Sequence, residues 1–203
     1  MAKQNKKRKT KRFRRFVRIF LLTFLLLFIA ASAYLGLNIN NGKYGKFPAK
    51  KELQNIENAQ ATEIFTSDGE LMGRYYFVNR NNLEFEEIPS HILHALIATE
   101  DTRFFDHSGI DYKSLFRVFF KTILIGDRSA GGGSTISQQL AKNLYSRKGE
   151  GVLAILGTKI REMILAHKLE DIFDKNKILQ LYLNTVPFGE NTYGLKNASQ
   201  LYF

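Results

Sequence analysis

The end of a predicted apolar helix carries side chains suited to acid–base chemistry, Glu100 and Asp101. The helix begins near Pro89, and two phenylalanines follow the acids closely. Burial beside aromatic rings raises the pKa of a carboxyl group towards that of a general base, and Arg103 adds a fixed cation nearby. Acids at a helix C-terminus oppose the helix dipole, so local stability does not favour them there. The alternative interpretation is a solvated acidic helix end without chemistry.

A second carboxylate, Glu162, lies on a predicted amphipathic helix with a cation on the same face. Lys159, Glu162 and Ala166 follow one another at spacings of three and four residues, so their side chains form one row. An ion pair at this spacing stabilises a helix by only roughly 0.2–0.5 kcal/mol. By itself the pattern is that of an ordinary amphipathic helix, and it becomes interesting only together with the other segments.

A glycine-rich turn precedes a polar stretch at 131–143, GGGSTISQQLAKN, and could serve an anionic or sugar ligand. A Walker phosphate loop requires a lysine directly after its last glycine, but here Lys142 is the first lysine and comes nine residues after Gly133. The nucleotide interpretation is therefore excluded. Thr135 followed by Gln138 is a capping-box pattern, which predicts a helix beginning at about residue 136.

The helix predicted after this turn presents two amides and a cation at helical spacing. Gln138 lies four residues before Lys142, and Gln139 lies four residues before Asn143, so each pair shares a face. Amides and an ammonium group beside a glycine turn suit a sugar with an attached phosphate. The alternative is an ordinary capped surface helix.

The elements that must position these groups are mostly helical. Apolar residues at three- and four-residue spacings predict helices at 90–105, 111–126, 135–146, 151–173 and 175–186. Two β-rich runs, about 61–66 and 70–78, flank a Ser-Asp-Gly turn and predict a hairpin. The expected fold is a mainly α domain with a small β-hairpin near its start.

The N-terminus has the composition of a membrane anchor. Residues 1–18 contain ten lysines and arginines and no acid, whereas the remaining 20 of the 30 basic residues face all 19 acids. The net charge of +11 therefore comes from this tail, and nucleic acid is not an expected partner. Residues 19–37 are uncharged, and as a helix they would be about 28 Å long, which is enough to cross a bilayer once.

The charge asymmetry predicts the orientation of this single pass. The positive-inside rule places residues 1–18 in the cytoplasm and the chain after residue 38 outside the inner (cytoplasmic) membrane. The alternative is a cleaved signal peptide ending near Ala31-Ser32-Ala33, although the apolar run exceeds a typical signal core. Residues 38–60 are interpreted as a juxtamembrane linker with a short helix, and 61–203 as the folded domain without cysteines or disulfides.

Two further features are less specific. The run LFRVFFKTILI at 115–125 is unusually apolar, and it predicts either a helix that dips into the membrane interface or a core helix. His91 and His94 are three residues apart on a helix and could touch one metal ion, but a surface or packing role is favoured because no third ligand is in view.

Taken together, these segments resemble the family-51 peptidoglycan glycosyltransferases, which comprise the transglycosylase domain of class A penicillin-binding proteins and the monofunctional transglycosylases. The resemblance runs from about Ala61 to Phe203 and rests on five motifs in order. These motifs are Glu100-Asp101-x-x-Phe104-x-x-His107-x-Gly109, the run from Gly133 to Asn143, Lys159-x-x-Glu162 with Leu169-Glu170, Lys177-Ile178-Leu179-x-x-Tyr182-Leu183-Asn184, and Gly194 through Ala198-Ser199 to Tyr202-Phe203.

The resemblance implies a lysozyme-like helical fold and polymerisation of lipid II, with inversion at the anomeric carbon, to give β-1,4-linked glycan and undecaprenyl pyrophosphate. It implies that Glu100 is the general base and that Glu162 helps manage the pyrophosphate, often through a divalent cation, Mg or Mn, which would make Glu162 a metal ligand. The implied partners are lipid II, the growing glycan strand, the membrane and other cell-wall synthesis proteins. The positions implied to bind substrate are Asp101, Arg103, Phe104, His107, Ser134, Thr135, Gln138, Gln139, Lys142, Asn143 and Lys159.

The chain departs from the family pattern in the third motif and at its end. The usual Arg-Lys pair is Thr158-Lys159, and an arginine expected about eight residues before the glutamate is Ala154, for which Arg147 and Lys148 would substitute. The family continues beyond the fifth motif, so we expect a C-terminally incomplete domain. A non-catalytic fragment that binds lipid II or partner proteins is therefore a second hypothesis. A third is a lysozyme-like hydrolase that uses both glutamates as a carboxylate pair.

Overall fold

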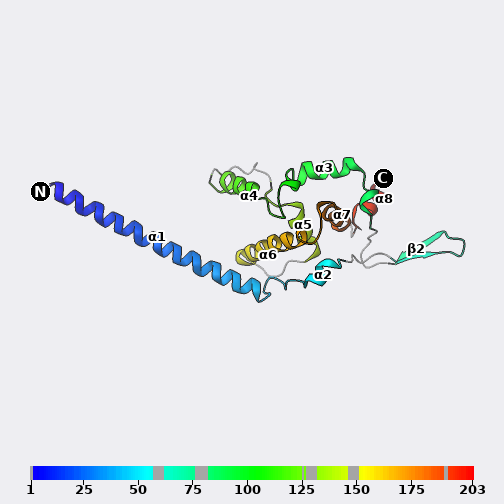
Figure 1. Ribbon diagram of the computed structural model, residues 1–203, viewed down its shortest axis with the longest axis horizontal. Helices are drawn as coiled ribbons and strands as arrows, with labels where there is room; N and C mark the ends of the chain where they lie inside the picture. The colour runs from blue at the N-terminus through cyan, green and yellow to red at the C-terminus, as the bar shows by residue number, and fades with distance from the viewer. Residues whose placement is uncertain are drawn as a thin grey trace.

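The computed structural model describes residues 2–56, 62–75, 82–124, 126, 132–145, 151–189 and 192–203 (Figure 1). Helices dominate these residues, and the prediction of a mainly α fold is confirmed. The elements are α1 (Ala2–Asn40), α2 (Lys50–Gln54), β1 (Thr62–Phe65), β2 (Leu71–Tyr75), η1 (Phe85–Glu87), α3 (Ser90–Glu100), η2 (Phe104–Asp106), α4 (Tyr112–Val118), η3 (Phe119–Leu124), α5 (Ile136–Leu144), α6 (Val152–Glu170), α7 (Lys175–Thr185), β3 (Pro187–Gly189), β4 (Thr192–Tyr193) and α8 (Leu195–Tyr202).

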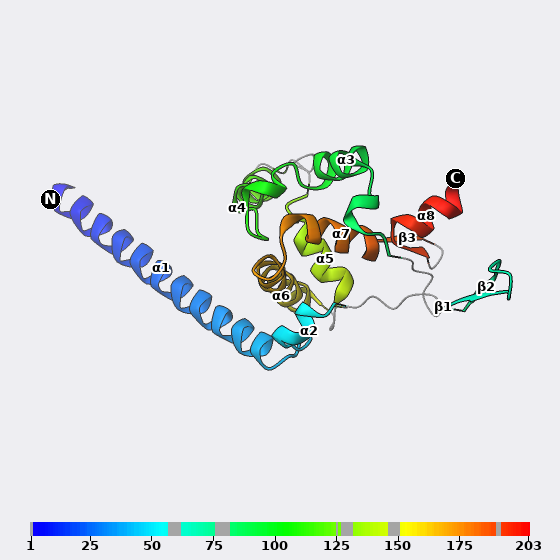
Figure 2. The same ribbon diagram turned by 45° about the vertical axis from the view of Figure 1, so that its right-hand side comes forward.

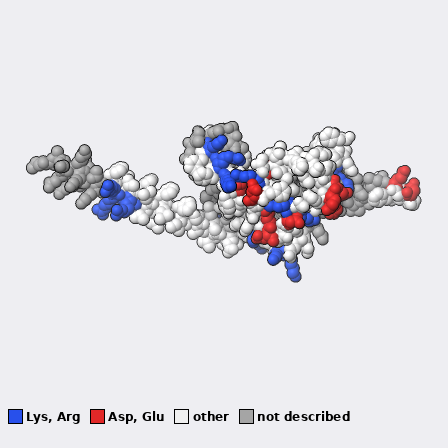
Figure 3. All heavy atoms as spheres, turned by 45° about the horizontal axis from the view of Figure 1, so that its top comes forward, with Lys and Arg blue, Asp and Glu red and all other residues white. Residues whose placement is uncertain are grey.

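Helix α1 projects away from the body as one continuous helix (Figure 1). Its segment Phe13–Asn40 has a mean hydropathy of 2.4 over its most apolar part and no burial there, so by length and composition it can cross a membrane. The predicted span, 19–37, lies inside this helix. In Figure 3 a cluster of basic side chains is followed by an uncharged stretch that leads to the body, as the sequence indicates.

The C-terminal end of α1 and the loop after it pack onto α6. Ile39 and Tyr44 are buried against Ala154, and a Cβ added to Gly157 would lie 2.3 Å from Cε2 of Tyr44. A glycine is thus required at 157 for the tyrosine ring to approach the helix backbone. Next to this contact, Nη2 of Arg161 donates to the carbonyl of residue 46 at 2.9 Å. The C-terminal end of the apolar helix α1 therefore packs directly against α6, the helix that carries Glu162.

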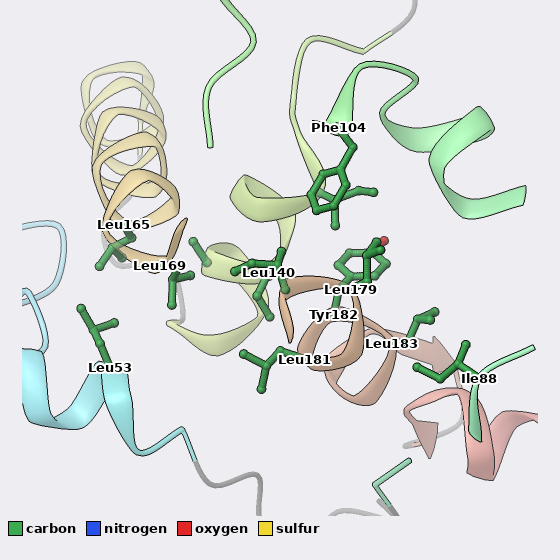
Figure 4. Close-up of a cluster of buried hydrophobic side chains, with 13 residues drawn as sticks. Leu53, Ile88, Phe104, Leu140, Leu165, Leu169, Leu179, Leu181, Tyr182 and Leu183 are labelled. Atoms are coloured by element: carbon green, nitrogen blue, oxygen red, sulfur yellow. The ribbon is translucent and has the colours of Figure 1, made fainter. Parts of the chain in front are cut away.

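The body is built around α5 and α7. Figure 2 shows α5 between α6 and α7, and both helices contact it. Every residue of α7 from 178 to 185 is buried, so this helix runs through the interior instead of covering it. The core formed by these helices with α2 and the 101–106 segment is shown in Figure 4, and its fully buried side chains include Phe104, Ile136, Leu140, Leu165, Leu169 and Ile178.

Side-chain caps fix where three helices begin. Thr135 accepts from the backbone N–H of residue 138 and starts α5, as the sequence predicts. Asp174 does the same for α7, and Asp111 for α4. In a full capping box the Gln138 side chain would bond back to the backbone N–H of Thr135. Here it instead makes a tertiary contact and donates to the carbonyl of Gly109 at 3.4 Å.

Helix α3 ends at Glu100, where the sequence predicts the acidic helix end, although the periodic stretch extends to residue 105. Asp101 leaves the helix with φ of −156°, and its carboxylate turns to accept a hydrogen bond from the backbone N–H of Ile136 at 3.1 Å. That tertiary bond explains the break, which helix periodicity alone does not reveal.

The segment predicted as one helix at 111–126 contains α4 followed by a π-helical stretch, η3. Its aromatic side chains face outwards, because Phe116, Phe119 and Phe120 are 63, 51 and 43% exposed. The core-helix alternative for this run is therefore wrong, and an exposed apolar surface takes its place. We call Phe116, Phe119 and Phe120 the aromatic patch.

The predicted hairpin is confirmed where the structure describes it. Strands β1 and β2 pair antiparallel, with Glu63 opposite Arg74 and an irregularity between Ile64 and Phe65. The turn contains Gly69 at φ +87°. The end of the predicted second run, 76–78, lies outside the described residues. A second hairpin of β3 and β4, and helix α8, were not predicted.

Candidate active site

Glu100 stands at the rim of a cavity of about 190 Å³, which we call the Glu100 pocket. The Glu100 side chain is exposed, so the expected burial of this carboxylate is wrong. It is nevertheless held in place, because Nε2 of Gln139 donates to its Oε2 at 2.7 Å. Helices α3 and α4 and the turn before α5 form the walls, which are lined by Thr99, Glu100, Asp101, Thr102, Asp111, Ser114, Arg117, Gly132, Gly133, Ser134 and Thr135.

Glu162 lines a second cavity, of about 210 Å³, which we call the Glu162 pocket. Only 1% of this residue is exposed, and Nζ of Lys159 lies 3.4 Å from its Oε2. The same ammonium group donates to Oγ of Ser134 at 2.7 Å, so it links α6 to the glycine turn. The residues that line the pocket are Ser134, Gln138, Gln139, Lys142, Lys159 and Glu162.

The two pockets adjoin one another. Ser134 lines both, and Gln139, which lines the Glu162 pocket, reaches Glu100 by a hydrogen bond. Two carboxylates that are 62 residues apart in the sequence are thereby brought to neighbouring cavities around the N-terminal half of α5. Because α5 is buried at residues 136, 137, 138, 140 and 141, it is not the ordinary surface helix that the sequence allowed.

Residues of the first motif hold the N-terminal end of α5 in place. Asp101 is buried, and besides the Ile136 N–H its Oδ2 contacts Nε2 of His107 at 3.0 Å. Oγ1 of Thr135 donates to the carbonyl of Gly109 at 2.7 Å. These contacts fix the helix end that carries Gln138, and they give Asp101 and His107 a supporting position.

Phe104 and Arg103 line neither of the two pockets. Phe104 has no exposed surface and lies in the core, where Nζ of Lys175 is 4.3 Å from its ring centroid. Arg103 forms a two-pronged pair with Asp111, with Nη2 2.6 Å from Oδ2, and it lines a neighbouring cavity that also includes His107. Asp111 belongs to both that cavity and the Glu100 pocket.

The Arg103 pair determines the ionisation of Asp111. Burial raises the pKa of Asp111, but hydrogen bonds from Arg103 and Ser114 and the charge of Arg103 outweigh burial. The pKa of this carboxyl is held well below its ordinary value, so Asp111 is anionic at neutral pH. The pair thus fixes the N-terminus of α4 against the segment that follows Glu100.

Other predicted positions are placed as follows. Lys142 is exposed and lines the Glu162 pocket, whereas Asn143 is half-buried and lines none of the cavities found among the described residues. His91 and His94 are exposed on α3. Across the described ranges, no three His, Cys, Asp or Glu side chains gather closely enough to hold a metal ion. Arg147 and Lys148 lie outside those ranges.

Sequence reasoning missed Tyr182, which reaches the site from α7. Its hydroxyl donates to Oε1 of Gln139 at 3.0 Å, and only 5% of the residue is exposed. Burial and the negative charge of Glu100 raise the pKa of Tyr182 to about 12, so the phenol is neutral at physiological pH. Tyr182 belongs to the fourth motif, but the sequence offers only one signal of a role in the site, which is a hydroxyl group within an otherwise apolar helix.

A further pair that the sequence did not reveal supports α5 from α6. Ser137 donates to Oε1 of Glu170, whose other oxygen accepts from Nζ of Lys175 at 2.6 Å. The same lysine donates to the backbone carbonyl of His107. Helices α5, α6 and α7 and the segment at His107 are therefore connected by charged hydrogen bonds in addition to apolar packing.

The chain is similar in sequence to known transglycosylases and penicillin-binding proteins. The family model for transglycosylases matches residues 68–203. The chain is similar to penicillin-binding protein 1A of Aquifex aeolicus, with 39% identity over 160 residues that cover 79% of this chain and 21% of the relative. It is also similar to penicillin-binding protein 1F of Bacillus subtilis, with 40% identity over 143 residues that cover 70 and 19%. Penicillin-binding protein 1A of Vibrio cholerae is 33% identical over 183 residues, which cover 88 and 22%.

The chain thus spans about a fifth of the length of these curated relatives. The matched region includes both pockets and the helices that support them, whereas α1 precedes the family match. The family model covers more than half of the chain. The chain therefore belongs to the transglycosylase family.

Proposed function

We propose that this protein is a peptidoglycan glycosyltransferase that polymerises lipid II into β-1,4-linked glycan and releases undecaprenyl pyrophosphate. The observation that carries the proposal is the adjoining pair of pockets, each with one glutamate, of which the Glu162 pocket also contains two lysines. One pocket has the group needed to activate a hydroxyl, and the other has the charges needed to receive a phosphate.

In this proposal Glu100 is the general base. A sugar hydroxyl is a poor nucleophile near neutral pH, and a positioned carboxylate that accepts its proton contributes roughly 10²- to 10⁴-fold. Glu100 borders an open cavity, so a hydroxyl can reach it, and its Oε2 is already held by Gln139. The acceptor 4-hydroxyl would lose its proton to Glu100 as its oxygen attacks the anomeric carbon from the face opposite the pyrophosphate. Attack from that face inverts the anomeric configuration.

The Glu162 pocket would receive the departing pyrophosphate. As the bond between the anomeric carbon and the phosphate oxygen breaks, negative charge accumulates on the leaving group, and preplaced cations stabilise it. Lys159 is held by Ser134 and Glu162, whereas Lys142 reaches the pocket from the exposed side of α5. In this account Glu162 orients Lys159 and does not itself touch the reacting carbon.

A divalent cation, Mg or Mn, fits the same pocket. Oε1 of Gln138 is buried without a hydrogen-bond partner, and the carboxylate of Glu162 lines the same cavity. Carboxylate and amide oxygens together with substrate phosphates are the ligands that Mg²⁺ prefers. We propose that Glu162 and Gln138 would hold such an ion. When bound, it would supply positive charge that neutralises the pyrophosphate.

The proposed location is the inner (cytoplasmic) membrane, crossed once by α1, with the basic N-terminus in the cytoplasm and the catalytic body outside. A lipid-linked substrate explains why the enzyme is tethered to the bilayer. The aromatic patch and the exposed apolar residues Val152 and Ile155 of α6 would contact the membrane interface. Other cell-wall synthesis proteins remain proposed partners.

Polymerisation of labelled lipid II by the purified full chain, with Mg²⁺ or Mn²⁺, tests the proposal. The wild type is expected to form glycan polymer, and Glu100→Gln is expected to lose that activity by at least about 10²-fold, which corresponds to the loss of a general base. Glu70→Gln is the matched control, because Glu70 is exposed in the hairpin turn, outside both pockets. A well-folded wild type that binds lipid II without forming polymer would instead support the non-catalytic alternative. Release of soluble fragments from preformed cell wall would support a hydrolase.

A further inference from the structure

We propose that Tyr182 is a positioning residue for Glu100, and that it acts through the side-chain amide of Gln139. This inference rests on the proposed role of Glu100 as a base and deepens it. Three elements far apart in the sequence meet in one line of hydrogen bonds, from the hydroxyl of Tyr182 on α7 to Gln139 on α5 and on to Glu100 at the end of α3.

The chemistry of the three groups determines the direction of this line. An ionised carboxylate only accepts hydrogen bonds, so the amide must present its nitrogen to Glu100. The amide oxygen then faces the phenol, which is neutral and has a proton to donate. If Tyr182 could not donate, the amide oxygen of the half-buried Gln139 would lose this partner, and the nitrogen would be oriented less firmly towards Glu100.

The arrangement has a consequence for the carboxylate itself. Nε2 of Gln139 holds Oε2 of Glu100 at 2.7 Å, so in the proposed reaction Oε1 would accept the proton of the substrate hydroxyl. The relay therefore orients the carboxylate that acts as the base.

Other charged groups around Glu100 are held by partners of their own. Of the residues that line the Glu100 pocket, Asp101 contacts His107 and the α5 backbone, whereas Asp111 pairs with Arg103. Arg117, from α4, donates to Ser114 at 3.4 Å. None of these contacts involves Tyr182, so Gln139 is the residue that links Tyr182 to Glu100 by hydrogen bonds.

The first test is the kinetics of lipid II polymerisation by full-length Tyr182→Phe. We expect kcat to fall by about tenfold, with KM changed less than about twofold. The lost hydrogen-bond donor affects the base that reacts, but it does not affect the binding of the substrate in its ground state. Tyr202→Phe is the matched control, because it removes a hydroxyl that donates to the Phe188 carbonyl on the exposed surface.

The second test needs no polymerisation, so it separates failure of the relay from failure of the proposed function. The ¹³C signal of the Glu100 carboxyl is recorded at neutral pH in the full chain with labelled glutamate, and it is identified by its loss in Glu100→Gln. Tyr182→Phe and Gln139→Leu should each move this signal in the same direction, and the double variant should match Gln139→Leu alone. An unmoved signal in both single variants, or a larger movement in the double variant, would overturn the relay.

Tyr202→Phe serves as the control here too, and an equal shift in it would also count against the relay. If Tyr182→Phe does not fold, 3-fluorotyrosine at position 182 keeps the ring and the hydroxyl in place. A more acidic phenol donates more strongly, so the Glu100 carboxyl signal should move in the direction opposite to its movement in Gln139→Leu. Absence of any response to fluorination would overturn the proposal.

Discussion

Replacement of Gly109 by alanine should destabilise the whole body, although residue 109 touches neither glutamate. Gly109 adopts φ of +83°, and a Cβ built there would lie 2.7 Å from the backbone carbon of Ala166 and 2.8 Å from its oxygen. The first motif therefore crosses α6 with no room for a side chain. Unlike a flexible side chain, a helix backbone cannot move aside without breaking its own hydrogen bonds.

Two costs combine in Gly109→Ala. An alanine with positive φ costs about 1–2 kcal/mol, and overpacking against an immobile backbone costs about 1–3 kcal/mol. The expected loss is about 2–5 kcal/mol, a large share of the roughly 5–15 kcal/mol that a typical domain has. Displacement of the 109 carbonyl would also disturb Thr135, whose hydroxyl donates to it at 2.7 Å.

Urea unfolding of the full chain in detergent, followed by circular dichroism, measures this loss. Gly69→Ala is the matched control, because Gly69 has nearly the same φ, +87°, with nothing within 4 Å of an added Cβ. It should therefore show only the backbone cost of about 1–2 kcal/mol. If both variants lost the same free energy of unfolding, the close approach to α6 would contribute nothing and the reasoning would be wrong.

Two further predictions follow from the site and its surroundings. Asp111→Asn should lower stability at pH 7 by about 1–3 kcal/mol, because it removes charged hydrogen bonds to Arg103. The pKa of Asp111 is lower in the folded chain than in the unfolded chain, so the pair with Arg103 stabilises the fold at a pH above the unfolded-state pKa of this carboxyl. This stabilisation is lost as pH falls below about 4, and the thermal unfolding curves of wild type and Asp111→Asn should therefore converge in acid. Replacement of the aromatic patch, Phe116, Phe119 and Phe120, by serine should weaken binding of the chain to anionic vesicles. Phe105→Ser is the control, because it changes a similarly exposed ring outside the patch. Equal binding of the two variants would contradict the proposed membrane role of the patch.

The sequence predicted the elements better than their contacts. Helical periodicity located α3 to α7, and the capping pattern placed the start of α5 correctly, because these signals are local. The end of α3 at Glu100 was expected, but the bond from the backbone N–H of Ile136 to Asp101 was not, because the two residues are 35 positions apart and no local pattern links them. The small β3 and β4 strands gave no usable alternation, since they are only three and two residues long.

The candidate site was predicted in composition and only partly in geometry. The glutamates were found from their neighbours, but Glu100 is exposed and not buried as expected, because aromatic residues near it in sequence face elsewhere. Phe104 points into the core, and Arg103 turns to Asp111. Tyr182 escaped notice because residues on a fully buried helix show no pattern that distinguishes a packing ring from a hydrogen-bonding one.

The joint between α1 and α6 gives the anchor a mechanical role. Gly157, where Tyr44 rests, precedes Glu162 by five residues on the same helix, a separation of about 7.5 Å along its axis. A tilt or rotation of α1 would therefore be passed to the Glu162 pocket over little more than one helical turn. Under the proposed function, the thickness of the surrounding lipid would then set the height at which the pyrophosphate of the substrate meets the two lysines of the Glu162 pocket.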